Sequence, residues 1–155
     1  MKLIIIRHAK AEGFAMNDSS RALTEKGMNQ AKRVGEFLKK QGLVPDVTIS
    51  SPYVRARQTA EIFCESAGAQ APVFEPWLAC GMSPALAMEE LQAYSNFETV
   101  AICGHNPDFA YLAEALLGSQ TGGIHVSKAS IIVFEEVRPP SQSGYLKMSL
   151  PPTVI

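Results

Sequence analysis

The opening of the chain, MKLIIIRHAKAE, constrains the fold more than any other stretch. Leu3 to Ile6 are consecutive branched apolar residues, and Arg7 and His8 follow them at once. A run this short and this apolar is typical of a strand covered on both faces, because helices need longer periodic segments. Ligands of open α/β sheets bind just beyond the carboxyl ends of the strands. Arg-His by itself more often marks a strand that ends in solvated charges, but the residues that follow in the chain favour a place for Arg7 and His8 at a binding edge.

The rest of the chain alternates between helical and extended patterns. Helices are expected over residues 24–41, 51–67, 84–94 and 108–117, and strands over residues 47–50, 73–74, 99–103, 131–135 and 145–150. Thr24, Ser51 and Ser83 are the expected N-caps of the first three helices. This rhythm predicts a three-layer α/β/α sandwich with a mostly parallel, mixed central sheet, whose closing pair of strands can run antiparallel.

Two further junctions between strand and helix carry residues that bind anions. Arg55 falls in the first turn of the second expected helix, where free backbone N–H groups already favour an anion. His105 follows the 99–103 strand directly. An arginine presents a rigid fork of donors to phosphate, and a histidine can act as base, nucleophile or ligand. Together with Arg7 and His8 they predict a compact cationic pocket suited to a tetrahedral dianion.

Composition narrows the class of protein. A chain of 155 residues, 46% hydrophobic and 19% charged, is typical of one globular domain over residues 1–155. A net charge of −1 offers no basic field for nucleic acid, and no apolar run approaches the roughly 20 residues that span a bilayer. The first residues lack the features of a signal peptide. Three widely spaced cysteines without a CxxC pair indicate reduced thiols of a cytoplasmic protein, with neither a disulfide framework nor a zinc site.

Four ordered motifs together resemble the histidine phosphatase superfamily, also called phosphoglycerate-mutase-like. They are the Leu-Ile-Ile-Ile-Arg-His opening, the helix start at 23–27, the Ser-Ser-Pro-x-x-Arg-Ala-x-Gln-Thr-Ala run at 50–60 and Gly-His-Asn at 104–106. The match covers nearly the whole chain. Ala9, in a position where the family usually has glycine, and the 18–21 loop resemble most the SixA-type phosphohistidine phosphatase branch.

The resemblance implies roles for individual residues. His8 would be the nucleophile that becomes a phosphohistidine intermediate, while Arg7, Arg55 and His105 would hold the phosphoryl oxygens. Arg21 would supply a further substrate contact. The resemblance implies no metal and no cofactor. His125 matches none of the motifs and is interpreted as an ordinary loop histidine.

The sequence departs from the family in its general acid. Most members carry a glutamate in the segment that corresponds to residues 78–81, which here reads Leu-Ala-Cys-Gly. Glu75, Glu89 and Asp18 are the only nearby carboxyl groups that could replace it. An alkoxide leaving group needs a proton, whereas the weak P–N bond of a phosphoramidate needs little help. We therefore expect a metal-independent phosphatase whose substrate and partner is a phosphohistidine-bearing protein.

Two alternatives stay open at this point. The chain could be a general phosphomonoesterase or a mutase of small phosphate esters. It could also be a non-catalytic phosphate-binding or interaction module that keeps the fold, although such proteins usually lose a pocket residue. A dinucleotide-binding enzyme is disfavoured, because no GxGxxG follows the first strand. The physiological substrate and the oligomeric state do not follow from the sequence.

Overall fold

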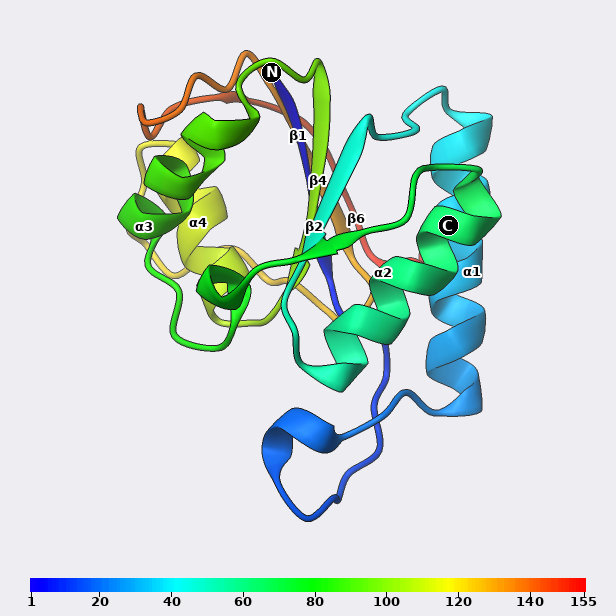
Figure 1. Cartoon of the computed structure of the whole chain (residues 1–155). Helices are drawn as coiled ribbons and strands as arrows, with labels where there is room; N and C mark the ends of the chain where they lie inside the picture. The colour runs from blue at the N-terminus through cyan, green and yellow to red at the C-terminus, as the bar shows by residue number, and fades with distance from the viewer.

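A computed structural model describes residues 1–155 of the chain, as one sheet with helices on both faces (Figure 1). The strands are β1 (Lys2–Arg7), β2 (Val47–Ser50), β3 (Val73–Phe74), β4 (Thr99–Gly104), β5 (Ile131–Glu135) and β6 (Tyr145–Leu150); the helices are α1 (Glu25–Lys40), α2 (Val54–Ala67), α3 (Pro84–Glu90) and α4 (Asp108–Leu116). The strand order is β3-β2-β4-β1-β5-β6. Strands β1 to β4 pair in parallel, while β5 and β6 pair antiparallel. The predicted mixed sheet with an antiparallel closing pair is confirmed.

Strand β1 shows how the sequence builds three layers. Leu3 and Ile5 belong to the apolar cluster that contains residues of α3 and α4, while Ile4 and Ile6 belong to the cluster that contains residues of α1 and α2. Successive side chains of a strand point to opposite faces of the sheet, so an unbroken apolar run needs cover on both sides. Figure 1 shows α3 and α4 on one side of the strands and α1 and α2 on the other. The predicted three-layer architecture is confirmed.

The strand register brings three chain segments together at one edge of the sheet. Arg7 lies beside Gly104 in the β1–β4 pair, and the His8 N–H donates to the Gly104 carbonyl at 2.9 Å. The Ser51 N–H donates to the Cys103 carbonyl, also at 2.9 Å. The segments that leave β1, β2 and β4 therefore continue side by side beyond the sheet, at the edge where the sequence predicted a pocket.

Two of the three predicted helix caps are confirmed. The Thr24 side chain accepts a hydrogen bond from the Gly27 N–H at the start of α1, and the Ser83 side chain accepts one from the Leu86 N–H at the start of α3. The third predicted helix continues beyond α3 as a 3-10 turn over Leu91–Tyr94, so its expected extent is recovered in two pieces.

The prediction that Ser51 caps the second helix is wrong. Helix α2 begins at Val54, with Tyr53 as its N-cap. The Ser51 N–H still pairs with β4, which keeps this residue in an extension of β2 rather than in the helix. Its hydroxyl therefore caps no N–H group of α2.

A long loop of residues 12–22, called here the β1–α1 loop, leaves the end of β1 and returns to α1. It contains a single 3-10 turn, Asp18–Ser20. Figure 1 shows this dark blue loop projecting beyond the sheet, at the end where α2 begins. None of the helices combines the length and apolar character that crossing a membrane requires.

Candidate active site

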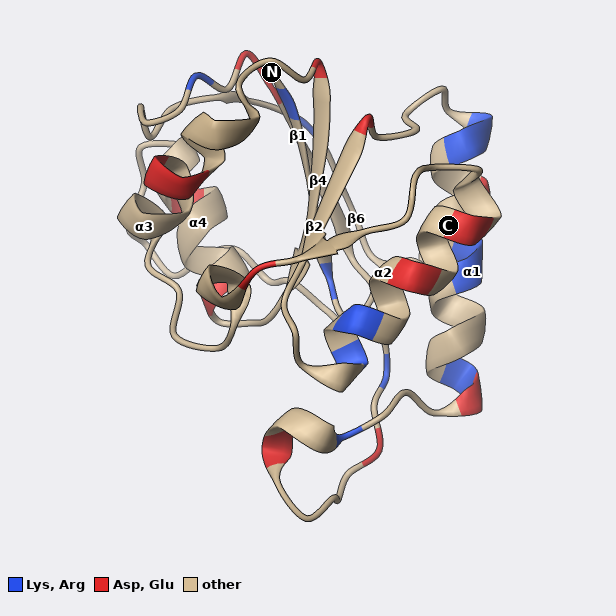
Figure 2. Cartoon of the chain, viewed as in Figure 1, with Lys and Arg blue, Asp and Glu red and all other residues tan.

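The predicted pocket residues converge from three elements at the carboxyl edge of the sheet. His8 follows β1, Arg55 lies in the first turn of α2 and His105 follows β4; their exposed fractions are 5%, 3% and 2%. The ring centroids of His8 and His105 lie 5.4 Å apart. In Figure 2 basic segments mark the start of α2 and the end of β1 at this edge. Residues that are 47 and 50 positions apart in the chain thus form one buried cluster.

The hydrogen bonds of His8 fix its tautomer. Its Nδ1 lies 2.8 Å from the carbonyl oxygen of Ala9. A carbonyl only accepts, so Nδ1 carries the proton and Nε2 keeps its lone pair. The Arg55 Nε–H donates to that same Nε2 across 3.3 Å. His8 therefore presents an unprotonated ring nitrogen to the pocket, which is the form a nucleophile requires.

Burial keeps both histidines neutral. It lowers the pKa of His8 to about 4; the bond to Ala9 acts in the opposite direction, and the charges of Arg55 and Arg7 lower the pKa further. It lowers the pKa of His105 to about 3, and the neighbouring His8 and Arg55 add to that effect. The positive charge of the pocket at neutral pH therefore comes from its arginines, with the histidines as neutral hydrogen-bonding groups.

Arg7 reaches the pocket with part of its guanidinium unused. Its Nη1 donates to the carbonyl oxygen of Val126 at 2.7 Å, which orients the group. Its Nε is buried and has no hydrogen-bond partner. Burial, and then the charge of Arg55, lower the pKa of Arg7, although an arginine stays charged near pH 7. An unpaired buried donor is costly, so an anion that accepts from it would be stabilised.

Arg55 connects the pocket to the β1–α1 loop. Its Nη1 donates to the carbonyl oxygen of Asp18 at 2.8 Å, and its Nη2 lies 3.0 Å from the Asp18 carboxylate. The same carboxylate pairs with Arg21 at 2.9 Å, and Arg21 also donates to the carbonyl oxygen of Glu12. Arg21, predicted as a substrate contact, is thus joined to the pocket through Asp18 and binds no other pocket residue directly.

Ser51 positions His105. The Ser51 hydroxyl lies 2.8 Å from His105 Nε2 and also accepts from the Tyr53 N–H. The other ring nitrogen of His105, Nδ1, is buried without a partner. The His105 ring is therefore held at one nitrogen and has a free hydrogen-bonding position at the other.

Thr59, a member of the 50–60 motif, also supports the site. Its Oγ1 accepts from the Ala9 N–H at 3.0 Å and donates to the Arg55 carbonyl at 2.7 Å. It therefore ties the peptide after His8 to the helix that carries Arg55. Its place one turn after Arg55 in the 50–60 motif was the available clue.

The segment without the family glutamate offers no carboxyl group to the pocket. Cys80 is exposed and its sulfur lies 3.6 Å from Arg55 Nη2. Desolvation raises the pKa of the Cys80 thiol, which leaves it a weak proton donor. The nearby Asp108 carboxylate accepts from the Gly81 and Met82 N–H groups and is thereby engaged with the backbone.

None of the three carboxyl groups proposed from the sequence is placed as a free acid. Glu75 accepts from the Tyr94 hydroxyl, and Glu89 is exposed on α3. Desolvation acts to raise the pKa of Asp18, but hydrogen bonds from Arg55 and Arg21, together with their charges, lower it overall. Asp18 is therefore ionised at neutral pH and has no proton to give.

Two other sequence expectations concern residues outside this cluster. His125 lines a separate apolar pocket with Leu117, Ile132 and Leu146, so its imidazole is not among the groups around His8. No group of three or more histidine, cysteine, aspartate or glutamate side chains is arranged to hold a metal ion.

Comparisons with known proteins agree with this geometry. Residues 3–79 match the family model of the histidine phosphatase superfamily (branch 1). The phosphohistidine phosphatase SixA of Escherichia coli is 30% identical over 133 residues, which cover 83% of this chain and 82% of that protein. An uncharacterized protein of Picosynechococcus is 36% identical over 138 residues, with 85% and 83% covered. The solved structure of the protein histidine phosphatase SixA complexed with tungstate superposes with a TM-score of 0.89 at 25% identity, covering 99% of both chains.

Proposed function

Because this chain belongs to the histidine phosphatase superfamily and is a phosphatase with a histidine nucleophile, we propose that His8 is that nucleophile and that the substrate is a phosphohistidine on a protein. This assignment rests on the protonation of the His8 ring. Its Nδ1–H is held by the Ala9 carbonyl, and its free Nε2 lies 3.3 Å from the Arg55 guanidinium.

In the first step Nε2 of His8 attacks phosphorus. A bond forms between Nε2 and phosphorus while the P–N bond of the substrate breaks. The electron pair of that bond stays on the substrate ring, which departs as a neutral imidazole because its other ring nitrogen enters the reaction protonated. The attack places positive charge on the His8 ring, and the Ala9 carbonyl at Nδ1 offsets it. Arg7 and Arg55 hold the non-bridging oxygens, and Nδ1 of His105 is free to make a third contact.

In the second step water attacks the phosphorus of phosphorylated His8. A P–O bond forms, the Nε2–P bond breaks, and the electron pair returns to Nε2. Both protons of the water leave with the phosphate product, and His8 keeps its proton on Nδ1. The same arginines stabilise both transition states, because the phosphoryl group stays in one place while the groups on either side of it change.

The absence of a usable acid favours phosphohistidine over a phosphate ester. Asp18 is ionised and Cys80 is a weak donor. An ester oxygen would have to leave as an alkoxide, whereas a phosphohistidine ring can carry the needed proton on its own second nitrogen and leave as a neutral imidazole. The E. coli relative is itself a phosphohistidine phosphatase, which supports the same substrate class for this chain.

The test compares three substrates in the presence of a chelator: a phosphohistidine-bearing protein, phosphoramidate and a phosphoserine peptide. We expect hydrolysis of the first two at rates at least tenfold above the third, with no effect of the chelator. Comparable turnover of the phosphoserine peptide would overturn the substrate assignment and favour a general phosphomonoesterase.

The nucleophile is tested separately with His8→Ala. We expect this variant to lose phosphoramidate hydrolysis, and the parent enzyme to accumulate an acid-labile phosphoenzyme that the variant lacks. His125→Ala is the matched control, because its imidazole lies in another pocket. Parent-like turnover by His8→Ala would show that the nucleophile lies elsewhere.

We further propose that residues 1–155 act as one histidine phosphatase domain in the cytoplasm. A single sheet carries all the pocket residues. Cys64, Cys80 and Cys103 are free thiols, as is usual in a reducing compartment.

A further inference from the structure

Two large apolar side chains at the tip of the β1–α1 loop have no place in either core. Phe14 is 88% exposed and Met16 is fully exposed, which makes them the most exposed large hydrophobic residues of the protein. In contrast, Ala11 and Leu23, at the two ends of the same loop, are buried. Single exposed apolar residues are common, but two of this size at one tip form a concentrated contact surface.

The base of the loop is fixed. Ala11 and Leu23 form an isolated antiparallel bridge, and the Glu12 N–H donates to the Ala22 carbonyl at 2.8 Å. The Leu23 N–H donates to the Gln58 side chain on α2 at 2.7 Å. The loop therefore projects from a tied stem, and its tip is presented at a defined place.

That place is the rim of the catalytic pocket. Asp18, two residues after Met16, binds Arg55 through both its carbonyl oxygen and its carboxylate. Figure 1 shows the loop extending beyond the sheet at the edge where β1 ends and α2 begins. A protein that brings a phosphorylated side chain to His8, which is itself 5% exposed, must lay its surrounding surface against this rim.

We propose that Phe14 and Met16 form a docking anchor for an apolar patch next to the phosphohistidine of the substrate protein. This inference rests on the proposed function. Asp18 and Arg21 pair with each other, and Glu12 lies at the tied base of the loop, so the contact surface that Phe14 and Met16 present at the tip is apolar. A rigid aromatic ring and, two residues further on, a flexible, polarizable methionine suit a protein surface of this kind.

The anchor serves proteins and not small substrates. Side chains this exposed line no wall of the pocket, so a phosphoramidate ion bound beside His8 would not touch them. The anchor therefore contributes to the affinity for a phosphoprotein and leaves the chemical step unchanged. This difference provides the test.

The experiment compares Phe14→Ala/Met16→Ala with the parent on two substrates. One is a histidine-containing phosphotransfer protein phosphorylated with potassium phosphoramidate, chosen with apolar residues next to its phosphohistidine; the other is phosphoramidate itself. We expect kcat/KM for the protein to fall at least tenfold, mainly through KM, and turnover of phosphoramidate to stay within twofold. Tenfold corresponds to about 1.4 kcal/mol of binding free energy.

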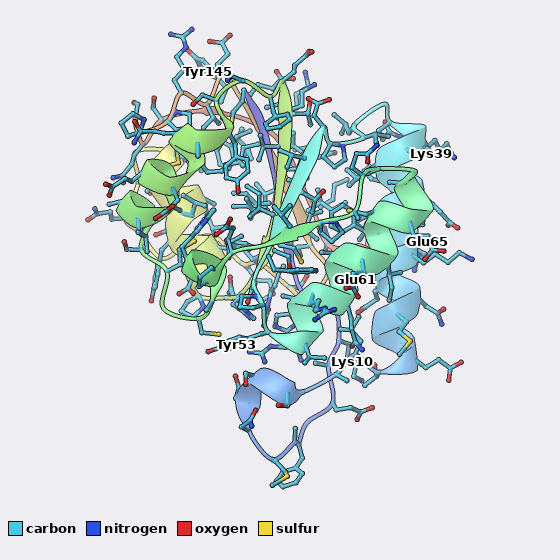
Figure 3. All side chains as sticks on the ribbon, in the orientation of Figure 1. Lys10, Lys39, Tyr53, Glu61, Glu65 and Tyr145 are labelled. Atoms are coloured by element: carbon cyan, nitrogen blue, oxygen red, sulfur yellow. The ribbon has the colours of Figure 1, made fainter.

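Tyr145→Ala is the matched control. Tyr145 is 69% exposed, and Figure 3 shows it at the end of the molecule opposite Tyr53 and Lys10, which lie beside the pocket and the loop. The Tyr145→Ala variant should have the same kcat/KM as the parent on both substrates.

The possible failures are distinguishable. A parent enzyme inactive on every phosphohistidine protein overturns the proposed function and the anchor together. If the parent is active and the double variant has the same kcat/KM for the phosphoprotein, the anchor alone is overturned. An equal fall of activity on both substrates also overturns the anchor, because it would indicate a disturbed pocket. A concentration-dependent dimer of the parent that the double variant abolishes would assign the tip to a second copy of the chain.

Discussion

The Nε–H of Arg55 donates to Nε2 of His8 across 3.3 Å. In the proposed mechanism, the group that stabilises negative charge on the transferred phosphoryl group is thus already in contact with the attacking atom. A phosphoryl oxygen that enters the pocket can take over this N–H as the lone pair of Nε2 turns to phosphorus. Little reorganisation is then required, which is the condition under which electrostatic stabilisation contributes most to catalysis.

Replacing Arg55 by lysine should lower turnover more than the unchanged charge suggests. Lysine keeps the positive charge but has no Nε–H to meet His8 and no planar fork. Loss of a charge-assisted hydrogen bond costs about 1.5–3 kcal/mol, or a rate loss of roughly 10- to 100-fold. Steady-state hydrolysis of phosphoramidate measures the effect. Arg57→Lys is the control, because Arg57 is exposed and contacts Glu61 on the same helix and the Phe74 ring, but not His8. Turnover of Arg55→Lys within twofold of the parent would contradict the assigned contact.

Acid should destabilise the parent protein more than a His8→Asn variant. The pKa of His8 is about 4 in the folded protein and about 6.5 when unfolded. Between these values the unfolded chain binds a proton that the folded protein does not, so the free energy of unfolding falls as pH falls. From pH 7 to pH 5 this single group removes about 2 kcal/mol. Urea unfolding of the parent and of His8→Asn at pH 7 and pH 5 measures the difference in free energy of unfolding. If this free energy falls equally for both proteins, burial does not suppress protonation of His8.

Ser51→Ala should lower both stability and turnover. The change removes the partner of His105 Nε2 and leaves a buried imidazole with neither nitrogen bonded. Such a loss costs about 1–3 kcal/mol of stability, and a less well held His105 should lower turnover about tenfold. Ser50→Ala is the control: Ser50 is also buried, and its hydroxyl donates to the Ser51 carbonyl without touching His105. Thermal unfolding and turnover are measured for both; equal turnover losses would argue against a positioning role for Ser51.

Gly27→Ala should destabilise the protein although alanine favours helices. A Cβ at Gly27 would lie 2.0 Å from the carbonyl oxygen of Lys10, far inside contact distance. Alanine gains about 1 kcal/mol in helix propensity, but a backbone clash of this kind costs about 1–3 kcal/mol or more. Because Lys10 lies two residues after His8, turnover should fall as well. Gly13→Ala meets nothing within 4 Å and serves as the control. A Gly27→Ala protein as stable and active as Gly13→Ala would show that α1 can shift without cost.

The sequence by itself determined the fold and the identity of the clustered residues. The apolar run before Arg7 can only be buried on both faces, and the alternation that follows supplies the helices that bury it. Parallel strands end at one edge of a sheet, so residues placed just after strands must meet there. His8, Arg55 and His105 were therefore predictable as neighbours from local patterns alone.

Only the tertiary structure decided how these residues act on one another. Ser51 has the sequence of a helix cap, yet pairing with β4 keeps it extended and gives its hydroxyl to His105. Asp18 resembled a spare acid, but its contacts with Arg55 and Arg21 keep it ionised. These outcomes depend on burial and on distances of about 3 Å between residues remote in the chain. Local propensity and periodicity contain no information about either, whereas the protonation of a side chain is set by both.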